Sequence, residues 1–222
     1  MNKIEELIKL HCPNGVEFRE LGKVFEIKNG YTPSKANSEY WTNGTIPWFR
    51  MEDIRQNGRI LSDSIQHITP EAVKGNGLFQ ANSIIVATTA TIGEHALITV
   101  DSLANQRFTY LTKCELFEER LDMKFFYYYM FIIDEWCKNN TNIASFASVD
   151  MGKFKKIMIP IPPIPVQQEI VKILDKFIEL ETELELQLKA ELEARKKQYD
   201  FYRSKLLSFS DLNTCWGGGK PL

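Results

Sequence analysis

A stretch of more than forty residues near the end of the sequence lacks any helix-breaking residue, and this limits the possible fold more than any other feature. It begins in the proline-rich segment IPIPPIPVQQEIVKILDKF, Ile159 to Phe177. No proline or glycine occurs between Val166 and Phe209. We therefore predict one continuous helix over 166–208, which at 1.5 Å per residue would extend roughly 65 Å. A helix of this length exceeds what a globular core can cover, so it needs a partner helix.

Apolar residues recur along this predicted helix in alternating steps of four and three. Such spacing is a heptad seam, and it predicts pairing in a coiled coil. Two further steps of four interrupt the alternation, a stutter that locally unwinds a coiled coil. The residues predicted to form a dimer interface are Ile170, Ile173, Phe177, Leu180, Leu184, Leu188, Leu192, Tyr199, Tyr202 and Leu206.

Charge is unevenly distributed along the same stretch. Acidic residues dominate its middle, from Asp175 to Glu193, and basic residues dominate its end, from Arg195 to Lys205. Antiparallel pairing would bring the acidic and basic portions of two helices closer together, so the pattern favours that orientation. The alternative interpretation is a solvated charged face without a specific partner.

The residues before the prolines have the pattern of an α+β domain. Short apolar runs alternate there with clusters of Gly, Asn, Pro and Ser, which predicts strands and turns. These runs are KVFEIKNG, TIPWFRM, SIIVATT, HALITV and RFTYLTK. Among them, Asp122–Lys138 is predicted to be a buried helix. We expect an N-terminal amphipathic helix (1–12), a globular domain (13–160), a proline joint with the long helix (161–209) and a flexible tail (210–222).

Composition narrows the possible classes of protein. No stretch approaches the ~20 apolar residues of a membrane span, and no signal-peptide pattern opens the sequence, so a cytoplasmic location is expected. The four cysteines form no C-x-x-C pair, which favours reduced thiols over a zinc site or disulfide framework. The net charge is −2. Any contact with nucleic acid must therefore use local positive charge, or a partner must share it.

Signatures of catalysis are missing from the sequence. No phosphate-binding loop or dinucleotide fingerprint occurs. The histidines His11, His67 and His95 stand far apart and suggest no catalytic triad. There is no amino-methyltransferase tetrapeptide and no convincing nuclease motif. We expect no catalytic residue, metal or cofactor in this chain, although a site assembled from distant residues stays open.

Several polar stretches are typical of recognition instead. IKNGYTPSKANSEYWTNGTIPWFR mixes basic, aromatic and hydroxyl side chains, TTATIG offers hydroxyl donors, and ANQRF offers side chains that can pair with adenine and guanine edges. Each stretch could equally be turn or core, and Trp48 and Phe49 are expected to be buried. The predicted DNA contacts are Lys28, Asn29, Tyr31, Thr32, Ser34, Lys35, Thr89, Thr91, Asn105, Gln106, Arg107 and Lys153.

In order, these stretches resemble one known family. PNGVEFRELGKVFEIKNGYTPSK, GTIPWFRMEDI, ATIGEHALI, ANQRF and the proline-led helix entry match the specificity (S) subunits of type I restriction–modification systems. The resemblance implies a non-catalytic, DNA-binding subunit with a target recognition domain at 13–160. It also implies methyltransferase (M) and restriction (R) subunits as partners, with S-adenosylmethionine bound by the methyltransferase. In this reading ATIG and IPWFRMEDI are strand-and-turn scaffold, and Gly93 permits a turn.

The chain departs from the family pattern in one respect. S subunits usually carry two recognition domains and two long helices that pack antiparallel, whereas this sequence shows one of each. We therefore expect a half-size form, in which a twofold homodimer would recognise an interrupted palindrome. The prolines then form a rigid joint between a DNA-reading domain and a spacer helix. A coiled-coil scaffold without DNA binding and a stand-alone nuclease are the alternatives.

Overall fold

The computed structural model describes residues 3–75, 77–143 and 147–208. The expected tail (210–222), including Cys215, lies outside the described residues. By its internal contacts the chain divides into two compact units, one up to Lys172 and one from Ile173 onward.

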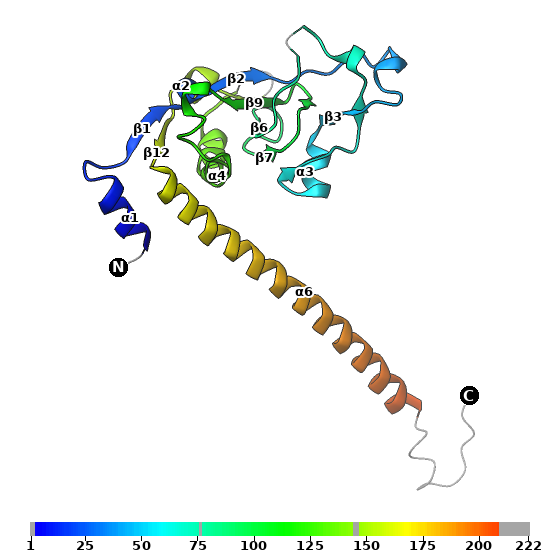
Figure 1. Cartoon of the computed structure of the whole chain (residues 1–222). Coiled ribbons are helices and arrows are strands. Elements are labelled where there is room, and N and C mark those ends of the chain that lie inside the picture. Colours follow the sequence, from blue (N-terminus) through cyan, green and yellow to red (C-terminus); the bar gives the residue numbers. More distant parts are fainter. Residues whose placement is uncertain (1–2, 76, 144–146, 209–222) are drawn as a thin grey trace, which may run out of the picture. The chain divides into compact units, whose positions relative to one another are not determined.

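A five-stranded mixed sheet forms the centre of the first unit (Figure 1). The strand order is β2-β9-β6-β7-β4, antiparallel except for the parallel pair of β4 and β7. Each of the runs KVFEIKNG, SIIVATT, HALITV and RFTYLTK supplies one strand, as predicted. The bounds are β2 Phe25–Asn29, β4 Ile60–Leu61, β6 Ser83–Ala87, β7 His95–Ile98 and β9 Phe108–Lys113.

The sheet is covered on both faces, which explains the unbroken apolar runs of its central strands. Ile84 and Val86 of β6 face a core that includes Phe126 of helix α4 (Met123–Asn139). Ile85 and Ala87 face the opposite core, which includes residues of β3 and α3. The buried helix expected over Asp122–Lys138 is thus confirmed, with Asp122 as its N-cap.

A second, three-stranded sheet extends the domain on one side. Its order is β5-β3-β8, and the run TIPWFRM supplies β3. Trp48 and Phe49 of β3 are buried, as predicted. The MEDI part of this segment was expected to be strand and turn, and that expectation is wrong: it forms α3, because Asp53 accepts the backbone N–H of Arg50 in a capping box. The bounds are β3 Ile46–Phe49, β5 His67–Ile68, β8 Leu103–Ala104 and α3 Met51–Asn57.

Smaller elements complete the domain. β1 pairs with β12, and β10 pairs with β11, in two separate antiparallel ribbons. Short 3₁₀ turns occur at Ser38–Tyr40, Pro70–Ala72 and Glu115–Phe117. The remaining bounds are α1 Lys3–His11, β1 Glu17–Glu20, α2 Leu21–Val24, β10 Thr141–Ile143, β11 Ala147–Val149, α5 Met151–Phe154 and β12 Met158–Ile161.

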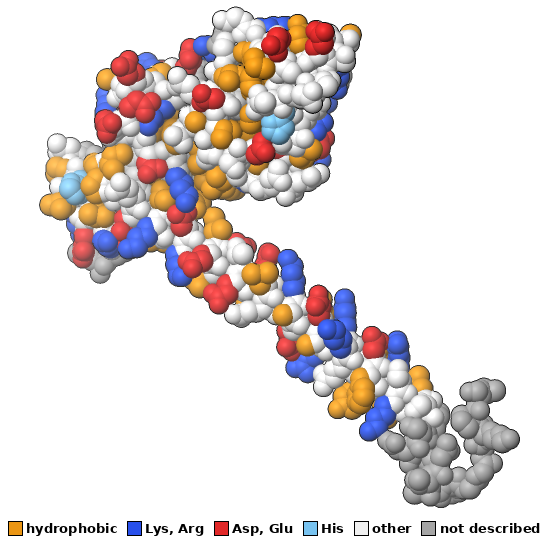
Figure 2. Space-filling view, turned by 45° about the vertical axis from the view of Figure 1, so that its right-hand side comes forward, with side chains coloured by type: hydrophobic (Ala, Val, Ile, Leu, Met, Phe, Trp, Pro, Cys, Tyr) orange, Lys and Arg blue, Asp and Glu red, His pale blue; other side chains and the backbone are white. Residues whose placement is uncertain are grey.

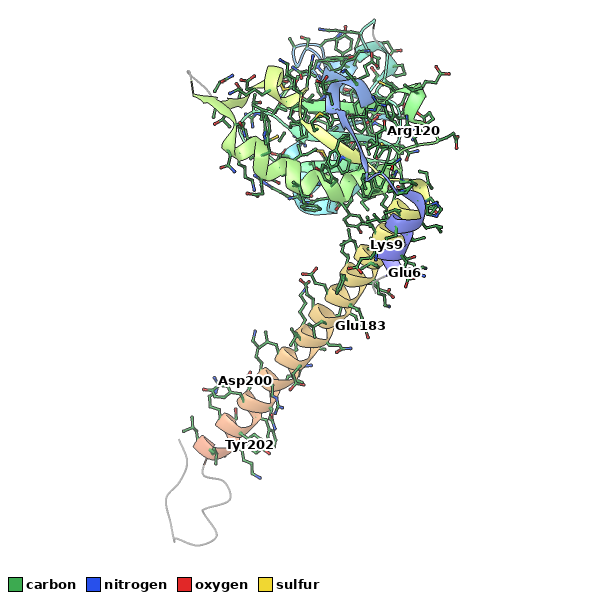
Figure 3. All side chains as sticks on the ribbon, turned by 90° about the vertical axis from the view of Figure 1, so that its left-hand side faces the viewer. Glu6, Lys9, Arg120, Glu183, Asp200 and Tyr202 are labelled. Atoms are coloured by element: carbon green, nitrogen blue, oxygen red, sulfur yellow. The ribbon has the colours of Figure 1, made fainter. Side chains whose placement is uncertain are left out.

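Helix α6 (Ile164–Ser208) runs unbroken to the end of the described residues, confirming the single long helix. Its first turns belong to the first unit, where α1 lies beside them (Figure 3). The Lys3 ammonium there contacts the Glu169 carboxylate at 2.8 Å. Among the described residues, no helix is long and apolar enough to cross a membrane.

The proline segment enters α6 in two steps. Pro160 lies in the paired strand β12, between the buried Ile159 and Ile161, in agreement with the predicted extended approach. Pro165 stands in the first turn of α6, where the missing N–H removes no helical hydrogen bond.

The cysteines fit the prediction of reduced thiols. Cys12, Cys114 and Cys137 are free, and the first and last are buried. Burial raises the pKa of the Cys137 thiol to about 12, and the nearby Asp134 carboxylate adds to the rise. The thiol is therefore protonated at neutral pH and unreactive.

Candidate nucleic-acid interface

Three loops meet at one end of the five-stranded sheet. Asn29, the last residue of β2, lies opposite Thr109 of β9, and Ala87, the last residue of β6, lies opposite Phe108. Because β9 is antiparallel to both strands, the β2 loop (30–37), the β6 loop (88–94) and the β9 loop (105–107) leave the sheet at the same end. This end carries the predicted contacts Lys28, Asn29, Tyr31, Thr32, Ser34, Lys35, Thr89, Thr91, Asn105, Gln106 and Arg107.

The β2 and β9 loops are in direct contact. Gly30 donates its backbone N–H to the carbonyl of Phe108 at 2.9 Å. A Cβ at position 30 would stand 2.2 Å from the carbonyl oxygen of Ala104, so only glycine permits this approach. The side chains of Thr32 and Gln106 hydrogen-bond across the same contact.

Tyr31 holds the β2 loop to the second sheet. Its hydroxyl accepts the backbone N–H of Lys74 at 2.7 Å, and its carbonyl accepts the indole N–H of Trp48 at 3.0 Å. The Lys74 ammonium lies 5.5 Å from the centre of the tyrosine ring. The structure therefore gives this half-buried tyrosine an anchoring role, and it adds Lys74 to the positive charge near the loop.

The β9 loop is a tight turn closed by its own side chain. The backbone N–H of Arg107 donates to Oδ1 of Asn105 at 2.9 Å, and the Asn105 N–H donates to the Phe49 carbonyl at 3.0 Å. Gln106 and Arg107 are left exposed at the tip. The geometry is that of an Asx turn, which fixes the backbone and presents the two following side chains.

The β6 loop is joined to its neighbours through the backbone of Thr88. Its N–H donates to the carbonyl of Arg107 at 3.0 Å, and its carbonyl accepts the N–H of Val149 at 2.9 Å. Thr89 and Thr91 follow, both half-buried. Gly93 has φ +80°, and a Cβ there would stand 2.6 Å from the Asp134 carbonyl oxygen, so the expected glycine turn is confirmed.

Lys153 comes from a separate element, the short helix α5. Asp150 caps that helix by accepting the N–H groups of Gly152 and Lys153. The hydrogen bond from Lys153 N–H, helped by that from Gly152, lowers the pKa of Asp150. The Lys153 ammonium lies 3.6 Å from the same carboxylate and remains largely exposed.

Positive charge is available at the loop end despite the acidic net charge. Lys35 and Arg107 are exposed, and neither forms an ion pair within the part of the chain that the structure describes. Lys28 is also exposed, but its ammonium lies 2.7 Å from Glu26. Among the predicted contacts, these two unpaired cations are therefore the strongest candidates for phosphate contacts, since neither has to leave an acidic partner.

Histidine–carboxylate pairs are a feature that the sequence did not indicate. Nδ1 of His95 lies 2.6 Å from Oδ2 of Asp134, both buried, and Nε2 of His67 lies 2.7 Å from Oδ1 of Asp63. Nε2 of His95 has no hydrogen-bond partner among the described residues, so no nucleophile there completes a triad. Asp134 follows His95 by 39 residues, a separation that only the packing of α4 on β7 closes.

The apolar seam of α6 is exposed. In the second unit, taken alone, Phe177, Leu184, Leu192 and Tyr199 each expose more than half of their surface. Figure 2 shows apolar side chains along the helix between groups of both charges. Ile170 differs, because it packs partly buried against the core of the first unit.

Comparison with known proteins defines the family. Residues 13–194 match the model of the type I restriction modification DNA specificity domain. The chain belongs to this family. Members similar to it include the specificity subunits of the Escherichia coli type I enzymes EcoprrI, 55% identical over 218 residues, and EcoR124I/EcoR124II, 37% identical over 206 residues. These matches cover 95% and 87% of this chain but 54% and 48% of the relatives, so it spans about half of their length.

Solved structures with a similar fold also come from type I restriction–modification systems. One is a chain from work on complex assembly and conformational transition of the type I R-M system, with TM-score 0.63 and 18% identity, covering 88% of this chain and 48% of that one. Another is the HsdS subunit from Thermoanaerobacter tengcongensis, with TM-score 0.58 and 17% identity, covering 80% and 42%. The predicted class, an α+β domain followed by a long helix, is confirmed.

Proposed function

We propose that this chain is a DNA-reading unit of a type I specificity subunit, and that the loop end of its central sheet contacts the target. The observation that carries the proposal is the convergence of the β2, β6 and β9 loops. Together they present amide, hydroxyl and guanidinium groups, the types that read base edges and hold phosphates. The chain has a structural and recognition role, and catalysis belongs to its partners.

Two copies of the chain form the working unit in this proposal. Exposed leucines along one stripe of α6 call for a partner, and a second α6 offers the same stripe. A twofold dimer has identical halves, so its target is an interrupted palindrome. Charge is a weaker argument for antiparallel orientation, since Arg195 already pairs with Glu191, and Lys176 with Glu179, within one helix.

The partners proposed are a methyltransferase subunit, which binds S-adenosylmethionine, and a restriction subunit, in a cytoplasmic complex. If these partners supply part of the positive charge that contacts the DNA, a chain of net charge −2 can still act in DNA recognition.

The test is selection from a random double-stranded DNA library by the full chain together with its methyltransferase subunit. We expect enrichment of one motif made of two inverted half-sites. Failure to enrich any motif, with the complex assembled, would favour the protein-scaffold alternative. Metal-dependent cleavage of DNA by the chain alone would instead support the nuclease alternative.

Changing the length of α6 gives a sharper prediction about target spacing. Inserting or deleting residues within Leu180–Leu192 changes the separation of the two proposed reading domains, because each helical residue adds 1.5 Å. We expect the spacer between half-sites to change by whole base pairs while the half-sites stay the same, as measured by repeating the selection. A spacer that stays constant would contradict a spacer role for the helix.

A further inference from the structure

A line of three hydrogen-bonded side chains crosses the base of the loop end. Oγ1 of Thr109 donates to Oδ1 of Asn29 at 2.8 Å, and the Oγ1 atoms of Thr109 and Thr88 lie 2.9 Å apart. Thr88 and Thr109 are buried, with 6% and 0% exposure, whereas Asn29 is exposed. The line therefore starts in the interior of the sheet and ends at the candidate DNA surface.

The direction of these hydrogen bonds follows from proton count. A threonine hydroxyl has one proton. Thr109 gives its proton to Asn29, so its oxygen must accept the proton of Thr88. Every group in the line then has one assigned role, and the carboxamide oxygen of Asn29 is occupied by an internal donor.

The remaining polar group of Asn29 is its amide NH₂. It makes no hydrogen bond to another residue in the described part of the chain. A free carboxamide can turn over and offer either a donor or an acceptor, but here turning would force Thr109 to send its proton to Thr88, and the proton of the buried Thr88 would then have no acceptor among the described residues. The packing of Thr109 therefore leaves only donors on the exposed side of Asn29.

We propose that Asn29 is a donor-only reading group, and that Thr109 and Thr88 are positioning residues that set this polarity. The inference rests on the proposed DNA-reading function and deepens it. The ligand chemistry is a hydrogen-bond acceptor on DNA, either a base-edge atom such as purine N7, guanine O6 or thymine O4, or a phosphate oxygen. The polarity of Asn29 excludes contact with the donor amino groups of adenine and cytosine.

The experiment repeats the library selection with the full chain and its methyltransferase subunit, using three variants. Thr109→Val keeps the side-chain shape but removes the hydroxyl, and Thr109→Ser is the matched control that keeps it. Asn29→Asp still accepts from Thr109 but exchanges the exposed NH₂ for an oxygen. Circular dichroism of each variant monitors folding, and Asn29→Asp is at an exposed position, so it tests the inference even if the buried variant unfolds.

If the acceptor is a base, we expect Thr109→Val to lower discrimination at one base pair of each half-site about tenfold, the size of one hydrogen bond. If it is a phosphate, Thr109→Val should weaken binding about tenfold for all sequences, and in both cases Thr109→Ser should stay within about twofold of the original chain. If the acceptor is a base, Asn29→Asp should shift preference at that position toward a base with an exposed amino donor. If it is a phosphate, Asn29→Asp should weaken binding equally for all sequences.

Two results separate the failure of this inference from that of the proposed function. If the original chain selects a motif and both Asn29→Asp and Thr109→Val select it with unchanged strength, the donor-only role is overturned while the DNA-reading function stands. If the original chain enriches no motif, the proposed function fails and this inference fails with it.

Discussion

Replacing Leu184 with glutamate should convert the proposed dimer into monomers. Leu184 exposes 56% of its surface in the single chain and lies in the middle of the apolar seam of α6. In a twofold dimer the change removes two leucines from one interface and places two carboxylates there. At about 2 kcal/mol for each lost leucine, the dimer is weakened by about 4 kcal/mol, or roughly a thousandfold in dissociation constant.

Leu186→Glu provides the matched control. Leu186 is exposed to a similar extent, 63%, on the same helix. It follows Leu184 by two residues, about 200° around the helix axis, and therefore lies off the seam. Light scattering over a range of concentrations should show a monomer for Leu184→Glu and a dimer for Leu186→Glu. A dimer that survives Leu184→Glu would place the interface elsewhere.

The two variants also separate dimerisation from DNA reading. Monomers of Leu184→Glu should keep the loop end intact, since all the predicted DNA contacts belong to the other compact unit. With the methyltransferase subunit present, they should lose the two-half-site motif and retain weak preference for a single half-site. Loss of all preference would mean that dimerisation shapes the reading surface itself.

Local patterns in the sequence were sufficient to predict most of the fold. Alternation of apolar runs and turn residues indicated the strands, and the absence of breakers indicated α6. The pattern failed at Met51–Ile54, where the whole of IPWFRMEDI was interpreted as strand and turn but Asp53 caps a helix instead. Capping depends on one side-chain hydrogen bond, and a periodic pattern carries no information about it.

The candidate site was predictable only as a set of residue types. Polar residues near strand ends pointed to the three loops, but the antiparallel register that gathers them is a long-range property. Thr88 and Thr109 were missed because a threonine inside an apolar run is read as part of the strand. Their position next to a polar loop, at the end of β6 and at the start of β9, is the one local feature that could have indicated a role at the site. Nothing local connects His95 to Asp134, which is why that pair was missed.

Gln167→Leu should destabilise the first compact unit, because it removes a buried polar link in the proline joint. Gln167 is fully buried. Its amide donates to the carbonyls of Pro162 and Arg120 at 2.6 and 2.8 Å, and its oxygen accepts the N–H of Asp122 at 2.8 Å. One side chain thus joins the first turn of α6 to the N-cap of α4. Arg120, one of its partners, is labelled in Figure 3, above α1.

Leucine fills nearly the same volume but leaves two carbonyls and one N–H without this partner, the Pro162 carbonyl at a buried site and the other two groups at part-buried ones. We expect a loss of about 3 kcal/mol in the free energy of unfolding, since each orphaned group costs on the order of 1 kcal/mol or more. For a unit of this size, the melting temperature should fall by about 9 °C in differential scanning calorimetry. Gln168→Leu, at the exposed neighbouring position, should shift it by less than about 2 °C.

The outcome decides what the segment IPIPPIPVQQE does. If Gln167→Leu lowers the melting temperature no more than Gln168→Leu does, the prolines and β12 alone hold the start of α6, and the glutamine has no part in the joint. If it melts as expected, the joint depends on a buried polar side chain that ties backbone groups from two helices. Such a network is geometrically demanding, because every partner must be in place at once. It therefore allows one arrangement of the first turn of α6 against α4, which apolar packing alone would not ensure.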